Sequence, residues 1–226
     1  MSNTVLSHPN RVNSPTAPDL RSVLTIIFAV WLALAFWLGA RGTFVTPRGA
    51  PPIPLLLAVL TPVVVFLFAF WTWLPLHDFV LAADVRLLTA TQSWRFAGFG
   101  FLALYTLGLL PGYFAWPAGL GDMAIGLTAP WVVIALSRKQ RFAASKTFVA
   151  WNIFGIFDFA VLAVGMGAIA PLLFVRLAQT VTPQMTTAAP MRHLPLVLIP
   201  TCFVPMFTIF HLVALFQARA INSTHA

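Results

Sequence analysis

Six long apolar segments dominate this chain and limit what it can fold into. They cover more than half of its 226 residues, and each is close to the roughly 20 residues that a helix needs to cross the hydrocarbon core of a bilayer. Within lipid the backbone must satisfy its own hydrogen bonds, which favours helices. We therefore predict an all-α integral membrane protein, a bundle of six transmembrane helices. The predicted spans are 23–40, 53–74, 96–116, 121–136, 147–170 and 194–216.

The composition agrees with a lipid environment and excludes several other classes. Hydrophobic residues make up 60% of the chain and charged residues only 8%, against about 25% charged in soluble domains. The chain contains no Glu, which rules out a His-Glu-x-x-His metalloprotease helix and a Glu-based di-metal bundle. Cys202 is the only cysteine, so no intrachain disulfide can form. The scarcity of polar residues also argues against an enzyme that acts on soluble substrates.

Basic residues predict how the chain is oriented in the membrane. We expect 1–22 to be a disordered tail, 23–218 to form the membrane domain and 219–226 to be a short second tail. Nine Lys and Arg residues fall on the side that holds both tails, and four fall on the other side. The positive-inside rule then places both termini in the cytoplasm, in a bacterial inner membrane. The net charge of +8 therefore reflects orientation, and we predict no nucleic-acid partner.

Prolines and glycines interrupt the third and sixth spans, which we expect to be kinked. An internal proline removes a helix hydrogen bond and frees the carbonyl four residues earlier. Pro205 would free the carbonyl of Thr201 in this way. Interrupted helices in two halves of a chain can mark a transport site, although neighbouring helices also absorb such kinks in ordinary membrane proteins. The connection 77–95 mixes apolar and polar residues and predicts an interfacial helix.

Asp158 carries the sharpest chemical signal in the sequence. It lies at the middle of 147–170, which holds no other ionisable side chain. A charge at that depth costs about 2.5–3.5 kcal/mol on insertion scales, so such residues usually face a partner, a cavity or a function. One hypothesis is a proton or cation site, and the alternative is a structural hydrogen bond between helices. Because no basic side chain lies at its depth in the predicted spans, we expect a protonated or water-linked carboxyl, not a salt bridge.

Two neighbours of Asp158 complete the primary candidate site. Asn152 lies to one side of the same predicted helix, and His211 lies in the last span. His211 could pair with Asp158, relay protons or bind a metal, but the predicted axial offset between them is about 9 Å. A hydrogen-bonded structural histidine is the alternative.

His77 and Asp78 mark the end of the second span.

His77 and His211 together raise the hypothesis of a membrane haem or redox protein. Haem iron can take axial histidines from helices, but no spacing in this sequence is diagnostic. No cofactor and no metal site are therefore predicted.

Asp122 and Arg95 are secondary candidates. Asp122 opens the fourth predicted span, where we expect it to cap the helix N-terminus; the alternative is an acidic mouth for a cation. Arg95 precedes the third span, where we expect its side chain to snorkel to the cytoplasmic interface. Its alternatives are an anionic headgroup contact and a pair with Asp84.

Gly108 and Gly112 form a small-residue seam of the G-x-x-x-G type, which packs helices closely within a bundle or between two copies. A homodimer or a membrane partner could therefore use this seam, beside the lipid bilayer itself. Three functional classes remain: a small transporter or permease-like protein with an intramembrane Asp, a non-catalytic assembly or scaffold component, and the haem protein.

Overall fold

The computed structural model describes residues 19–47, 50, 52–139, 141–159 and 188–223. This described part is helical and contains no strand, which confirms the predicted all-α class. Four of its helical stretches are long and apolar enough to cross a membrane: α1 (Leu20–Ala40), α2 (Ile53–Thr72), α6 (Gly112–Arg138) and the stretch Ile199–Ser223. Much of the predicted fifth span falls outside the described residues.

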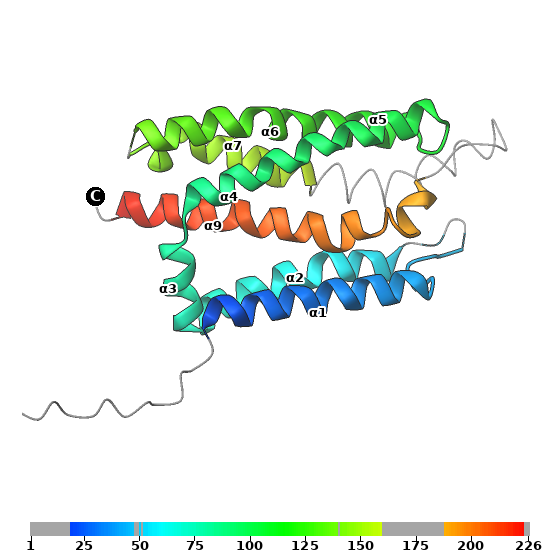
Figure 1. The fold of residues 1–226 in the computed structure, drawn as a ribbon, viewed down its shortest axis with the longest axis horizontal. Helices are drawn as coiled ribbons and strands as arrows, with labels where there is room; N and C mark the ends of the chain where they lie inside the picture. Colours follow the sequence, from blue (N-terminus) through cyan, green and yellow to red (C-terminus); the bar gives the residue numbers. More distant parts are fainter. Residues whose placement is uncertain (1–18, 48–49, 51, 140, 160–187, 224–226) are drawn as a thin grey trace, which may run out of the picture.

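The helices run side by side along one long axis (Figure 1). The last helix, α9, is central, because it contacts α2, α3, α4 and α7. Helix α3 lies across one end of the bundle (Figure 1). It covers only the start of the connection 77–95, for which we predicted an interfacial helix, because α4 and η1 pack along α6. The remaining bounds are α3 (Leu74–Ala82), α4 (Val85–Thr91), the 3-10 helix η1 (Gln92–Gly98), α5 (Phe99–Thr106), the 3-10 helix η2 (Phe142–Ala144), α7 (Lys146–Phe157), the 3-10 helix η4 (Ala189–Arg192), the π-helix η5 (Ile199–Phe203) and α9 (Val204–Ser223).

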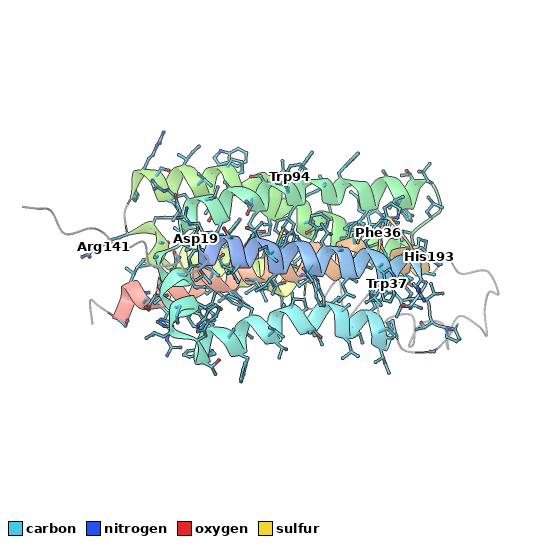
Figure 2. All side chains as sticks on the ribbon, turned by 60° about the horizontal axis from the view of Figure 1, so that its bottom comes forward. Asp19, Phe36, Trp37, Trp94, Arg141 and His193 are labelled. Atoms are coloured by element: carbon cyan, nitrogen blue, oxygen red, sulfur yellow. The ribbon has the colours of Figure 1, made fainter. Side chains whose placement is uncertain are left out.

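The outer surface of the bundle is apolar along its length, and charge gathers at its ends. The side chains of Phe36, Trp37 and Trp94 are exposed, whereas Asp19 and Arg141 lie at one end of the bundle and His193 at the other (Figure 2). An apolar surface of this extent is the expected outer face of a protein surrounded by lipid.

The predicted third span is divided in the structure. Helix α5 ends at Thr106, and α6 begins at Gly112. Between them Gly108 adopts φ +70°, which side chains with a Cβ rarely allow, and Pro111 precedes α6 with the extended backbone that proline favours. The chain therefore turns at 107–111. Helix α6 continues through the whole predicted fourth span, and its antiparallel neighbour is the segment from α4 to α5.

The predicted small-residue seam lies at this turn. Gly108 has no atom within 4 Å of where a Cβ would stand, and Gly112 faces Tyr105 and Trp116. Gly112 therefore lies where α6 contacts α5, whereas Gly108 meets no neighbouring helix among the described residues. The homodimer stays a prediction.

The last predicted span, 194–216, contains the π-helical turn η5, which directly precedes α9. Pro205 has no N–H to offer to the carbonyl of Thr201. That carbonyl instead accepts a hydrogen bond from Trp31 Nε1 at 2.9 Å, which confirms the predicted free acceptor. The bond ties α1, which buries few residues, to the centre of the bundle.

Helix η1 packs against α6 so closely that one position on α6 must be glycine. A Cβ on Gly126 would collide with the backbone nitrogen of Phe96 and would lie 2.8 Å from the carbonyl carbon of Arg95. These are main-chain atoms, so no change of rotamer can relieve the overlap. Gly126 thereby sets the depth at which the η1 backbone enters the bundle.

We expect Gly126→Ala to lower the thermal unfolding temperature of the detergent-purified protein clearly, because overpacking of this kind costs about 1–3 kcal/mol. Gly100→Ala is the matched control, since a Cβ at Gly100 meets nothing within 4 Å. Equal unfolding temperatures for the two variants would contradict the close approach of η1 to α6.

Candidate functional site

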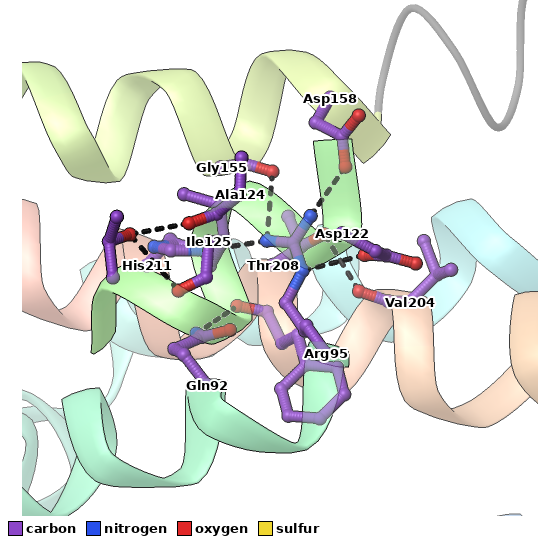
Figure 3. A network of polar contacts seen from close by, with 12 residues as sticks. Gln92, Arg95, Asp122, Ala124, Ile125, Gly155, Asp158, Val204, Thr208 and His211 are labelled. Carbon is purple, nitrogen blue, oxygen red and sulfur yellow. Dashed lines mark hydrogen bonds and ion pairs between the residues drawn. The ribbon is translucent and has the colours of Figure 1, made fainter. Parts of the chain in front are cut away.

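Arg95 is the hub of a buried polar network that joins four helical elements (Figure 3). Its Nη2 donates to Asp158 Oδ2 at 2.6 Å, and its Nε donates to Asp122 Oδ1 at 2.7 Å. Its Nη1 lies 3.0 Å from His211 Nε2 and 3.4 Å from the carbonyl oxygen of Gly155. These partners come from α6, α7 and α9 and from the residue that follows α7. All three guanidinium nitrogens are therefore engaged.

The hydrogen-bond chain fixes the protonation state of His211. An arginine N–H can only donate, so His211 Nε2 must accept and carries no proton. The proton then lies on Nδ1, which donates to Asn152 Oδ1 at 2.9 Å. Asn152 Nδ2 in turn donates to the carbonyl of Phe148 at 2.9 Å. His211 is thus a neutral histidine that helps to orient Arg95, and a second positive charge beside the guanidinium would be unfavourable.

The centre holds more negative than positive charge. One guanidinium meets two carboxylates, which leaves a net charge of −1 when both are ionised. Asp158 Oδ1 is buried and has no hydrogen-bond partner among the described residues. The ring of Phe159 lies 3.7 Å from the Arg95 guanidinium carbon, a cation–π contact that supports the positive group without neutralising a carboxylate. An unsatisfied buried carboxylate oxygen of this kind requires an explanation.

Two glycines make room for the network. A Cβ on Gly121 would overlap the Asp158 carboxylate, and a Cβ on Gly155 would overlap the His211 imidazole. Gly155 is three residues before Asp158, so the two lie on the same face of the helical segment. That face therefore presents the Gly155 carbonyl and the Asp158 carboxylate to Arg95, and the missing Gly155 side chain leaves room for His211.

Two cavities border the centre. A small one of about 50 Å³ touches both Asp122 and Asp158 and extends to Arg192. A larger one of about 620 Å³ is lined mainly by apolar side chains and reaches Arg95 and Asp122. Asp122 therefore borders both cavities.

Three expectations drawn from the sequence are wrong at this site. Arg95 does not snorkel to an interface, since its side chain is only 1% exposed. Asp158 forms a buried salt bridge, which we did not expect. Asp122 does not cap a helix, because it lies in the middle of α6. All three follow from the turn at 107–111, because the helical segment that ends there begins further toward the N-terminus than predicted and brings Arg95 into the bundle.

The primary candidates come together, but not by direct pairing of the acid and the histidine. Asp158 and His211 both contact Arg95 and not each other, while Asn152 contacts His211. Arg95 is the residue whose role the sequence reasoning missed. A usable signal was present, because two acids inside predicted spans demand a cation nearby, and Arg95 directly precedes an apolar segment.

His77 and Asp78 lie apart from this centre. Both belong to α3, and their side chains contact each other at 3.2 Å. His211 does not fit a haem shared with His77, since both of its ring nitrogens already make hydrogen bonds. Within the described ranges, no group of three or more His, Cys, Asp or Glu residues could hold a metal ion.

Comparison with known proteins adds a family but no activity. A family model described as "Domain of unknown function (DUF8737)" matches residues 52–219, a range that includes the whole network around Arg95 and leaves out α1. No curated protein and no solved structure matches the chain.

We expect Arg95→Met to destabilise the protein by about 3–5 kcal/mol, because removing one partner of a buried ion pair leaves uncompensated charge. Thermal unfolding in detergent measures this loss. Adding Asp122→Asn and Asp158→Asn to Arg95→Met should recover much of it. Arg86→Met is the control, since Arg86 pairs with Asp84 at an exposed site. A triple variant as unstable as Arg95→Met alone would show that lost packing, not unpaired charge, is responsible.

Proposed function

The chain belongs to the DUF8737 family, whose description assigns no activity, and we propose from the site that the protein is a small transporter or permease-like membrane protein. In this proposal the Arg95–Asp122–Asp158 centre takes up and releases one proton. The observation that carries it is the pair of carboxylates on a single buried guanidinium, with one Asp158 oxygen that has no hydrogen-bond partner in the part of the chain that the structure describes. Intramembrane ionisable groups of this kind commonly mark proton relays and transport pathways.

The proposal includes six passages through the inner membrane with both termini in the cytoplasm. Four helical stretches have the length and composition for a crossing. The segment from α4 to α5 runs alongside α6 (Figure 1) and supplies another passage, and α7 begins the remaining one. Arg138 ends α6, and Lys139 and Arg141 follow it. Arg141 lies at the end of the bundle where Asp19 also lies (Figure 2). That end is cytoplasmic by the positive-inside rule.

A proton has a defined effect on the centre. With both carboxylates ionised the net charge is −1, and protonation of Asp158 leaves Arg95 paired with Asp122 at a net charge of zero. The Arg95–Asp158 bond then loses its charge, so the link between η1 and the end of α7 weakens while the links to α6 and α9 remain. In this proposal the proton comes from the end of the bundle opposite the cytoplasmic one, where the small cavity that borders both acids also touches Arg192.

The alternative function is a non-catalytic component of a membrane assembly, in which the same network only locks four elements together. Buried ion pairs can specify one arrangement of helices without any transport role. The two functions differ in whether Asp158 exchanges a proton in the folded protein.

We expect pH-induced infrared difference spectra of the purified protein to show a protonated carboxyl C=O band that is missing in Asp158→Asn. Asp158→Asn should also abolish proton flux into proteoliposomes, measured with an entrapped pH-sensitive dye across a panel of solutes. Asp78→Asn, at an exposed site, is the matched control for both measurements. A variant that loses only thermal stability, with the band and the flux unchanged, would favour the assembly component.

A further inference from the structure

The larger cavity has the shape and chemistry of a ligand site that opens toward the bilayer. Its volume of about 620 Å³ lies within the range of about 300–1,000 Å³ that is usual for small-molecule sites. It lies between the η1–α5 segment and the start of the last span, and Trp94, Gly100, Phe159, Phe203 and Phe207 contribute to its wall. Trp94 is 77% exposed and stands at the outer surface (Figure 2). A ligand can therefore enter laterally from lipid.

The charged end of this cavity is acidic. Asp122 has a side-chain exposure of 13%, against 1% for Arg95 and 3% for Asp158. All three guanidinium nitrogens of Arg95 are already engaged, so Arg95 is poorly placed to receive an anion. Asp122 is thus the ionisable group most accessible to a ligand, and it belongs to a centre with an excess negative charge.

The aromatic wall also favours a cation. Phe159 stacks with Phe207, and Phe203 stacks with Phe207. All three rings line the cavity that Asp122 borders. The faces of aromatic rings attract positively charged groups, most strongly where water is excluded.

We propose that this cavity binds a lipophilic monovalent cation, with its charge beside Asp122 and its apolar body among the phenylalanines. The inference rests on the proposed function, for which it names the substrate class. A monovalent cation and a proton each bring the centre to a net charge of zero, so each disfavours binding of the other. The protein then exchanges one cation for one proton.

Tetraphenylphosphonium tests this proposal, with tetraphenylborate as an anion that carries the same four phenyl groups. Binding to the purified full-length protein is measured by titration calorimetry. We expect saturable binding of one phosphonium per chain, at least tenfold weaker at a pH low enough to protonate the centre. Asp122→Asn should weaken it at least tenfold as well. Tetraphenylborate should not compete.

Gly100→Phe tests the place of binding without disturbing the centre. A Cβ at Gly100 meets no atom within 4 Å, and Gly100 borders the cavity. We expect a phenyl ring at this position to fill part of the cavity and to weaken binding of the phosphonium at least tenfold. Leu87→Phe is the matched control, since Leu87 is exposed on α4 and is not among the residues that border the cavity. It should leave the affinity unchanged.

Equal affinities for tetraphenylphosphonium and tetraphenylborate would overturn the inference. So would phosphonium binding that Gly100→Phe does not weaken, or a co-purified lipid in the cavity that tetraphenylphosphonium cannot displace. The outcomes also separate the two proposals. Phosphonium binding that depends on Asp122 and Gly100, without any proton flux, supports the cation site and counts against the transporter. Proton flux that depends on Asp158, without phosphonium binding, overturns the cation site alone.

Discussion

The structure depends on the need to hold the Arg95 guanidinium inside an apolar bundle. A buried charge is tolerated only when it is paired and hydrogen-bonded, and Arg95 meets that requirement with partners from separate parts of the chain. Asp122 comes from α6, Asp158 follows α7, and His211 comes from α9. Helices α6 and α7 follow each other through residues 139–145, whereas η1 and α9 are distant from each other in the sequence. The guanidinium therefore ties together helices from separate parts of the chain.

Several glycines allow the backbone to take the shape that the centre around Arg95 requires. The turn at Gly108 separates α5 from α6, and the absence of a side chain at Gly126 lets the η1 backbone lie close against α6. Gly121 and Gly155 leave the space that the Asp158 carboxylate and the His211 ring occupy. A side chain at any of the last three positions would push apart two elements that Arg95 must reach together. Packing and electrostatics are therefore coupled at the same residues.

Hydropathy was sufficient for the helical class and for Asp158, because the cost of burying charge can be read from composition along the chain. It also led to His211 and Asn152, which do contact each other. It failed for Arg95 and Asp122 because it places a helix boundary where the apolar run begins, next to the charge. The true boundary is set by Gly108 and Pro111, whose backbone preferences override an unbroken apolar pattern. Charge balance between the two acids and Arg95 was the missing constraint.

Charge balance bears on whether the network only holds the helices together or also binds a charged species. A network that only holds helices together needs one carboxylate for one guanidinium, since a second buried acid adds a desolvation cost. In this protein the second acid is present, its charge is not matched by the neutral His211, and among the described residues one Asp158 oxygen has no hydrogen-bond partner. When both carboxylates are ionised, the excess negative charge costs stability, and binding of a positive species relieves it. A centre with this charge balance is compatible with the proposed uptake of a proton or a cation.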